Sequence, residues 1–308
     1  MGASFPVLMM QNFAGDGYFG RNGSSQHKIN MTTGSQSIKN NSAWNTNVQD
    51  CFASASTPGT TDNAGWNIGL VNIANNLIEK VGRMPFSTET DAFAANNISP
   101  PRLAHGSCQS LVKGYALGGF NQNDFSTLQS TQSVTFSTAV VAASGALLNN
   151  TYNTNGFRSE THGYYAGGAV SSPIATIAKM PFSTEVWANS SASLSSAQNQ
   201  VAIVENAASA YMLGGVNGST FTNVIAKLVK ATDTRTNLSA TLALVRSGGA
   251  AFESDSTGFL FQGQTTGFSL TADSDALQFS TETRFDFSAN IANTVSSVMM
   301  QTMKSGGY

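Results

Sequence analysis

The residues that could perform chemistry are few in this chain. Two cysteines, Cys51 and Cys108, and three histidines, His27, His105 and His162, are scattered along 308 residues. Structural zinc sites need ligands at short, defined spacings, and a catalytic Ser, His and Asp need a mutual arrangement. Neither pattern is readable here, and no phosphate loop or pair of carboxylates at a defined spacing accompanies these residues. We therefore expect no metal site, no cofactor and no enzymatic activity.

Both cysteines are expected to be free and partly buried thiols. A disulfide between them is the alternative, but its geometry is strict and the chain is not rich in disulfide-forming residues. His105 is expected to be a packed ring whose nitrogens are satisfied by its neighbours, and His162 is expected to be an exposed turn residue.

A set of mostly polar residues recurs six positions before an aromatic side chain. We predict that these residues lie on the innermost strands of the fold and line a central channel. Facing channel water is the simpler role for them, and ion or ligand binding is the alternative. The set comprises Asn12, Gln109, Arg158, Glu205, Glu253 and Thr302.

Two repeating markers indicate the elements that must position these residues. The stretch "AKMPFSTEV" (178–186) restates "GRMPFSTET" (82–90), and Phe182 aligns with Phe86, Phe136 and Phe279, whereas Met31 and Lys230 occupy this place in two further copies. The second marker is an aromatic residue, recurring at intervals of 48, 49, 49, 47, 48 and 49 residues: Tyr18, Trp66, Tyr115, Tyr164, Tyr211, Phe259 and Tyr308.

A period of about 49 residues, holding several short alternating apolar stretches, predicts a four-stranded antiparallel blade and a run of blades forming a β-propeller. Six copies of each marker predict six blades. In one unit we expect strands over 200–205, 210–215 and 223–229, a tight turn at "KATD", and positive φ at Gly214 and Gly215. The aromatic that opens the second strand is expected to pack between adjacent sheets.

The repeat count leaves a surplus strand at the ends. "VLMMQNFAGDGY" (7–18) and "SVMMQTMKSGGY" (297–308) share "MMQ" at the same distance from the closing Tyr. We expect an extra innermost strand within 1–16, the six-repeat propeller over 17–295, and another extra innermost strand within 296–308. One copy would close the ring, and the other would join a sheet edge, dock on a neighbouring subunit or lie as a tail on its own blade.

The stretch "PPRLAHGSCQSLVKGYALGG" (100–119) resembles the kelch motif, with an Arg and a His before an apolar strand, an aromatic and a glycine pair. The combination of "GYxxGG" with "KMPFSTE" in a chain so low in charge resembles the kelch-like propeller proteins of bacteriophages, including phages of cyanobacteria. This resemblance implies a six-bladed kelch-like propeller and a virion protein, either a tail fibre or an adhesin. The alternatives are a capsid decoration or tail-nozzle component without a receptor role, and an intracellular kelch-type interaction module.

Composition restricts the partners. Charged residues make up 10% of the chain, against about 25% in typical soluble domains. The net charge is −2 and no basic cluster is present, so nucleic acid and anionic membrane surfaces are not expected partners. No stretch approaches the ~20 apolar residues that span a bilayer. The N-terminal segment lacks a basic n-region, so we expect synthesis in the host cytoplasm without a signal peptide, and a place in the virion.

The binding surface is predicted on the loops that join the second strand to the third and the fourth strand to the next blade. These loops are long, variable and polar, and function tends to lie on loops presented by a rigid scaffold. Their Asn and aromatic side chains suit both sugar hydroxyls and protein surfaces, so other virion subunits and host-surface polysaccharide or protein are the expected partners; solvated loops without a ligand are the alternative. The candidates are Asn121, Asn123, Phe125, Tyr152, Asn153, Asn217 and Phe221. The extra segment 55–65 is expected on the opposite face, as an arm that docks to a neighbour.

Overall fold

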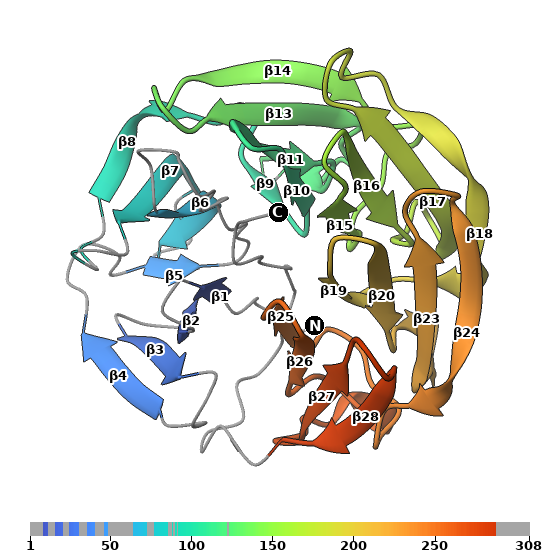
Figure 1. Cartoon of the computed structure of the whole chain (residues 1–308). Coiled ribbons are helices and arrows are strands. Elements are labelled where there is room, and N and C mark those ends of the chain that lie inside the picture. The colour runs from blue at the N-terminus through green and yellow to red at the C-terminus, as the bar shows by residue number, and fades with distance from the viewer. Residues whose placement is uncertain are drawn as a thin grey trace.

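The protein is described by a computed structural model that covers residues 92–121 and 123–287, preceded by 9–11, 16–20, 25–30, 36–40, 46–48, 64–72, 77–85, 88 and 90 (Figure 1). The structure is all-β over these residues, apart from the short 3-10 helix η1 (Thr266–Phe268). None of the described helices has the length and apolar character needed to cross a bilayer.

Five blades with described side chains follow one another along the chain, each a four-stranded antiparallel sheet whose strands pair in sequence order. The first is β5 (Thr46–Val48), β6 (Ala64–Asn72), β7 (Leu77–Pro85) and β8 (Ala92–Asn97). The next are β10 (Gly106–Gln109), β11 (Lys113–Leu117), β13 (Ser130–Thr135) and β14 (Val141–Ala146), then β15 (Asn155–Arg158), β16 (His162–Ala166), β17 (Ile174–Pro181) and β18 (Ala188–Gln198). The last two are β19 (Ala202–Glu205), β20 (Ser209–Leu213), β23 (Val224–Val229) and β24 (Thr234–Thr241), and β25 (Ala250–Glu253), β26 (Thr257–Phe261), β27 (Ser274–Gln278) and β28 (Thr283–Asp286).

The N-terminal strands pair in the same way. β1 (Met9–Gln11), β2 (Asp16–Gly20), β3 (Ser25–Asn30) and β4 (Gln36–Asn40) form a four-stranded antiparallel sheet, in which Met10 lies opposite Tyr18. Of these strands the structure describes the backbone pairing alone. The predicted surplus strand within 296–308 and most of the predicted arm, residues 55–63, lie outside the described residues.

Figure 1 shows the blades arranged around a common centre, with the first strand of each blade innermost and the fourth at the rim. The innermost strands β10, β15, β19 and β25 contact one another in succession. The predicted all-β propeller of four-stranded antiparallel blades is therefore confirmed. The strands expected over 200–205, 210–215 and 223–229 are β19, β20 and β23, each within two residues of the expected bounds.

The core lies between blades rather than within one. One cluster joins Trp66 and Val81 of the β5–β8 blade to Val134 and Phe136 of the next, and equivalent clusters fill the following two gaps. A single sheet cannot bury its own apolar face, so each blade depends on its neighbour for a core.

The two sequence markers meet in this core. Phe182 stacks on Tyr115 of the preceding blade with ring centroids 5.8 Å apart, and Phe279 stacks on Tyr211 at 5.2 Å. Phe136 packs on Trp66 in the same relation, at 5.8 Å. The expectation that the strand-opening aromatic packs between sheets is confirmed, because the repeated Phe is its partner in the next blade.

The carboxylate that ends "FSTE" adds a polar contact across the same gap. Glu185, Asp233 and Glu282 each form an ion pair with a lysine of the preceding blade, from Lys113, Lys179 and Lys227 respectively. Each of the three acidic residues also has positive φ, between 51° and 54°. We call these contacts the inter-blade latches. They explain why the turn sequence is repeated: its Phe and its carboxylate both bind the preceding blade.

Lys230 breaks the Phe series and has its own partner. Its ammonium lies 2.5 Å from Oε2 of Glu205, with the two side chains only 3% and 4% exposed, and it also donates to the backbone carbonyl of Asn206. Glu205 Oε2 accepts a further bond from the backbone N–H of Arg158. The β19–β24 blade thus replaces an aromatic contact between blades with a buried ion pair inside one blade.

Candidate functional site

The most elaborate loop joins β11 to β13 and is held at both ends by one arginine. Arg102, in the short strand β9 (Arg102–Leu103), donates to the carbonyls of Gly118 and Ser130 at 3.0 and 2.8 Å and to the Ser130 hydroxyl at 3.1 Å. Strand β9 pairs with β12 (Phe120–Asn121) inside the loop. Burial lowers the pKa of Arg102 to about 10, so the guanidinium stays charged at neutral pH.

The tip of this loop is organised by side-chain hydrogen bonds. The Asn121 carboxamide oxygen accepts from the Asn123 N–H at 3.1 Å, and the Phe125 N–H donates to the Asn121 carbonyl at 2.7 Å. Asp124 accepts from the hydroxyl and the N–H of Ser126, at 2.6 and 2.9 Å, and these bonds lower the pKa of Asp124. The loop therefore has a defined conformation, although its tip faces water.

Phe125 is the most exposed large apolar side chain among the described residues. Its side chain is 70% exposed and its φ is +56°. Left-handed backbone at a bulky non-glycine residue is uncommon and costs about 1–3 kcal/mol. The loop thus presents an apolar ring to solvent at an energetic cost, a combination that is typical of a binding residue.

Tyr152 lies beside this loop. Its ring packs against Phe120 with centroids 4.2 Å apart, so the loop after β14 and the loop after β11 share an aromatic contact. The structure therefore brings together the predicted residues Asn121, Asn123, Phe125 and Tyr152 on one side of the ring. They combine the exposed amide of Asn123 and the half-buried amide of Asn121 with two aromatic rings.

Asn153 has a backbone role that the sequence did not indicate. Its N–H donates to the Ala104 carbonyl, and its carbonyl accepts from the N–H of Gln200. The Gln200 carbonyl accepts in the same way from the N–H of Gly248. All four residues have positive φ, between 52° and 63°. They form a hydrogen-bonded belt that passes from blade to blade just before the innermost strands.

Two predicted binding residues belong to the β19–β24 blade, and only one is accessible. Asn217, in β21 (Val216–Asn217), is exposed at a turn where Gly218 has φ +60°. Phe221, in β22 (Thr220–Phe221), is only 7% exposed, so its prediction as a binding residue is wrong. Strand β22 pairs back on β21 and turns this ring inward.

The predicted channel-lining residues are buried instead of exposed to an open channel. Gln109, Arg158, Glu205 and Glu253 end the innermost strands and are between 1% and 7% exposed. Innermost strands approach one another closely: the Asn155 amide donates to the Val201 carbonyl, and a Cβ at Gly156 would lie 2.0 Å from the Ser107 carbonyl. At the strand ends themselves, Glu205 is buried against the Lys230 ammonium and the backbone N–H of Arg158. Asn12 and Thr302 lie outside the described residues.

The opposite end of the propeller carries a second apolar surface. The turns after β10 and β13 and the turn before β18 expose Leu111, Val112, Val140 and Val186. The equivalent turns of the next two blades read "NAA", "SDS", "TDTR" and "TETR". Among the three blades compared, these exposed aliphatic side chains thus belong to the β10–β14 and β15–β18 blades. They form an apolar surface on the end opposite to the loop face.

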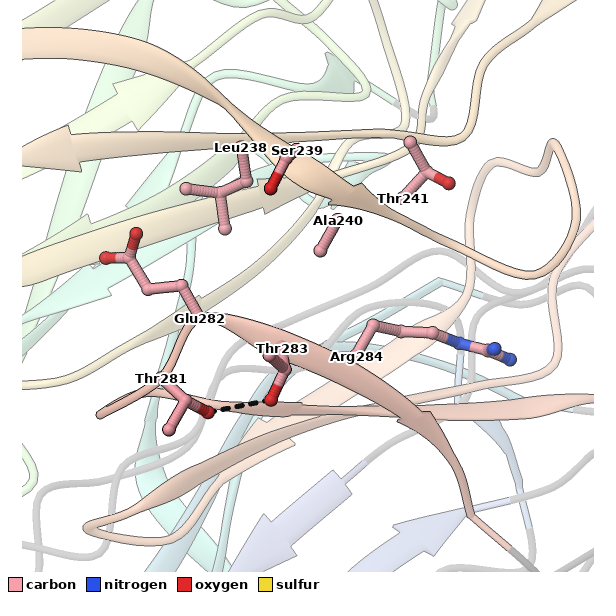
Figure 2. A pocket seen from close by; sticks show the side chains of 8 residues that line it. All are labelled: Leu238, Ser239, Ala240, Thr241, Thr281, Glu282, Thr283 and Arg284. Atoms are coloured by element: carbon pink, nitrogen blue, oxygen red, sulfur yellow. Dashed lines mark hydrogen bonds between the residues drawn. The ribbon is translucent and has the colours of Figure 1, made fainter.

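A groove with a volume of about 460 Å³ runs between the rim strands β24 and β28 (Figure 2). In Figure 2 the side chains of Leu238, Ala240 and Glu282 point into the gap between the two strands, whereas those of Thr241, Thr281 and Thr283 point away from it. Sequence reasoning missed this groove, because it lies between strands that belong to different repeats. The lining residues are Leu238, Ser239, Ala240, Thr241, Thr281, Glu282, Thr283 and Arg284.

The cysteine and histidines that the structure describes lie in separate blades or strands. Within the described part of the chain no cluster of three or more His, Cys, Asp and Glu residues could hold a metal. Cys108 is free and buried, as predicted, whereas Cys51 lies outside the described residues. His105 is buried, and its Nδ1 lies 3.0 Å from the Gly106 carbonyl. His162 opens β16 and is half-buried, not an exposed turn residue.

The fold defines this chain as a β-propeller with an exposed loop face. No protein-family model and no curated protein matches the sequence. Among solved structures the chain is similar to one titled "Structure of YjhT", with a TM-score of 0.73 and 14% sequence identity, over 93% of this chain and 98% of that one. At this level of identity the likeness shows the propeller fold alone.

Proposed function

We propose that this chain is a non-catalytic β-propeller of a phage virion, of the tail fibre or adhesin type, which binds a host surface or a neighbouring virion subunit. Phe125 carries the proposal. Its ring is 70% exposed on a left-handed backbone, and hydrogen bonds of Asn121 and Asp124 hold the loop around it. Burying that ring against a partner would contribute about 1.5–3 kcal/mol of binding free energy.

The virion assignment is supported by the sequence resemblance to kelch-like propeller proteins of phages. The low fraction of charged residues is part of that resemblance. With so few charges, Asn, Ser and Thr must hydrate the surface of the protein. On this proposal the protein is made in the host cytoplasm and leaves it in the particle, and its partners are other virion proteins and host-surface polysaccharide or protein.

We also propose that the ring closes with six kelch-like blades. The four-stranded pairing of β1–β4 supports this number, as does the contact between β1 and β25, the innermost strand of the last blade. The sequence pattern adds support. In the gap that would close the ring, the last blade offers Phe259, which has no hydroxyl, and the first repeat offers Gly34 at the position aligned with Glu185. Both partners of an inter-blade latch are thus missing together, as expected if these two repeats face each other.

Binding of the labelled full-length chain to cyanobacterial cells and to their purified lipopolysaccharide tests the binding role. Phe125→Ser should lower the bound fraction about tenfold, equivalent to about 1.4 kcal/mol. Phe285→Ser is the matched control, since Phe285 is an exposed Phe on the rim strand β28, away from the loops. This control should stay within about twofold of the wild type.

The exposed apolar turns at the opposite end of the propeller provide the result that would contradict this proposal. Should Val112→Ser and Val186→Ser abolish the interaction while Phe125→Ser leaves it intact, the apolar turns bind the partner and the loop face does not.

Immunoelectron microscopy of intact particles with antibodies to this chain would locate it on tail or capsid. Its absence from every particle component would contradict the virion assignment.

A further inference from the structure

The dipeptide Asn-Gly occurs in two opposite environments among the described residues. Asn217 precedes Gly218 at the tip of the hairpin formed by β21 and β22, and Asn155 precedes Gly156 in the innermost strand β15. A third copy, at 22–23, lies outside the described residues. In this dipeptide the backbone nitrogen of the glycine can attack the side-chain amide of the asparagine, because glycine has no side chain to obstruct the approach.

Both reacting groups of the Asn217 copy are accessible. Residues 217 to 220 are all exposed, and a Cβ placed on Gly218 would meet no atom within 4 Å. Within the part of the chain that the structure describes, neither the Gly218 N–H nor the Asn217 carboxamide makes a hydrogen bond. Water and hydroxide can therefore reach the N–H proton and the carboxamide carbon.

The reaction requires the backbone between the two residues to rotate, and the hairpin offers little resistance. Only two residue pairs hold it, Asn217 with Thr220 and Val216 with Phe221, around a loop of two residues. Opening the pair next to the loop uncovers no core, because the buried side chains of the hairpin, Val216 and Phe221, belong to the other pair. Exposed tips of this kind open locally at far lower cost than core strands.

The Asn155 copy is restrained on every side. Asn155 is only 3% exposed, and its carboxamide nitrogen donates to the Val201 carbonyl of the next blade. Gly156 pairs with Tyr165, and a Cβ placed on it would lie 2.0 Å from the Ser107 carbonyl. Asn155 can therefore react only when the innermost strands open, which costs far more free energy than opening a loop tip.

We propose that Asn217 is a site of spontaneous deamidation in the native protein. The Gly218 nitrogen loses its proton to base and bonds to Cγ of Asn217, and the Cγ–Nδ2 bond breaks to release ammonia, which leaves a cyclic imide. Water then adds to one of the two imide carbonyls and breaks its bond to nitrogen. Opening at Cγ gives aspartate on the original backbone, whereas opening at the backbone carbonyl gives isoaspartate. One water is consumed, one ammonia is released, and nothing is oxidised or reduced.

Either product adds one negative charge to a chain whose net charge is −2. The new charge lies on the same face as Phe125, because both residues belong to loops between the second and third strands of their blades. Isoaspartate also lengthens the backbone at the end of β21, so the pairing of Asn217 with Thr220 should be lost. The protein thus acquires a second, more acidic form with time. This inference does not depend on the binding role proposed for Phe125.

Incubation of the full chain in native buffer at pH 8, followed by peptide mapping by mass spectrometry, tests the proposal. The peptide that contains Asn217 should gain the mass that separates a hydroxyl from an amino group, and an isoaspartyl methyltransferase should label part of it. Asn217 should react at least about tenfold faster than Asn155, because an opening that costs about 1.4 kcal/mol more is about tenfold rarer.

Two further measurements separate the effect of structure from that of sequence. In urea, where both copies are unfolded, the two rates should agree within about twofold. Gly218→Ala places a Cβ beside the attacking nitrogen, so it should slow the reaction of Asn217 severalfold and leave Asn155 unchanged.

Three results would overturn the proposal. If Asn217 stays intact in native buffer and reacts in urea, the hairpin protects it. Equal rates for Asn217 and Asn155 in native buffer would assign the reaction to global unfolding. An undiminished rate in Gly218→Ala would mean that the backbone nitrogen is not the attacking group.

Discussion

The phenolic hydroxyl of Tyr115 donates a hydrogen bond to Oε1 of Glu185 across 3.0 Å, from one blade to the next. The same carboxylate accepts from the Lys113 ammonium and the Ser144 hydroxyl, both at 2.8 Å. One side chain of the "FSTE" turn thus joins three side chains of the preceding blade. The rings of Tyr115 and Phe182 stack in the same gap, so hydrogen bonds and aromatic packing together join these two blades.

The composition of the latch changes as a unit. Where Trp66 replaces the tyrosine, the residue in the carboxylate position of the next blade is Ala139, which also has positive φ. There the Arg83 guanidinium lies 5.8 Å from the Trp66 ring centroid, a cation–π contact. A carboxylate is therefore present in the described gaps where a tyrosine hydroxyl and a lysine face it, and absent where they do not.

Glu185→Gln should destabilise the protein in a pH-dependent way. Burial by itself would raise the pKa of Glu185, but hydrogen bonds from Lys113, Ser144 and Tyr115, with the charge of Lys113, outweigh it and hold the pKa below the ordinary value. A carboxyl whose folded pKa is lowered contributes stability above its unfolded pKa, about 4.3, and loses it as the pH falls through the folded value.

At neutral pH we expect the variant to lower the free energy of unfolding by about 1–2 kcal/mol, because the carboxylate is partly exposed and its interactions are screened. Urea unfolding followed by tryptophan fluorescence at a series of pH values measures the effect. The difference from the wild type should diminish below about pH 4.3. Glu160→Gln, at an exposed turn, is the control, and a difference for Glu185→Gln that persists unchanged to low pH would contradict the prediction.

Lys230→Met should be among the most damaging single changes. It leaves the carboxylate of Glu205 buried without its ammonium partner, which costs about 3–5 kcal/mol. Lys179→Met is the matched comparison, since Lys179 forms an ion pair but is more exposed, and a loss of about 1 kcal/mol is expected there. Thermal unfolding measures both variants. Adding Glu205→Gln to Lys230→Met should recover part of the loss, and no recovery would argue against the pair as the cause.

Gly156→Ala should separate two innermost strands. The new Cβ would lie 2.0 Å from the Ser107 carbonyl of the neighbouring blade, a distance that only a backbone shift can relieve. Overpacking of this kind costs about 1–3 kcal/mol or more. Gly218→Ala meets no atom within 4 Å and should cost about 1 kcal/mol, from its positive φ alone. Equal unfolding midpoints for the two variants would refute the close approach.

Cys108 should resist thiol reagents in the folded protein. Burial raises the pKa of its thiol, the Glu205 carboxylate raises it further, and Arg158 offsets only part of this. The thiolate is the reactive form, so iodoacetamide at pH 8 should label Cys108 only after unfolding in urea. Peptide mapping by mass spectrometry distinguishes Cys108 from Cys51. Labelling of Cys108 in native buffer within minutes would mean that the strand ends open readily.

The repeat could be recognised from the sequence because every blade has the same local backbone geometry. That geometry fixes the spacing of the Phe182 and Tyr115 markers, the glycine pairs and the alternating apolar strands. The role of Arg102 was harder to find, although Arg246, three repeats later, holds a loop end in the same way through the Asp273 carbonyl. The two arginines lie 144 residues apart, about three periods, so the repeat spacing itself is a sequence signal for this shared role.

The predicted channel-lining residues show where sequence interpretation failed. Periodicity correctly placed Gln109, Arg158, Glu205 and Glu253 on the innermost strands, but it cannot state how near those strands come to one another. That distance depends on glycines such as Gly156 that belong to the neighbouring repeat. Phe221 was assigned to a loop surface for a similar reason, since the hairpin that turns it inward has only two residues on each side.

The sequence by itself determined the period, the strand content of a blade and the aromatic residue that packs between blades, because these depend on local spacing that is repeated along the chain. Only the tertiary structure decided which polar residues are buried, that Lys230 pairs with Glu205, and that a groove opens between β24 and β28. The burial and the groove arise between blades, where residues about 50 positions apart meet, and the ion pair joins two residues of one blade that are 25 positions apart. Their contacts depend on how closely two sheets pack, which no local pattern records.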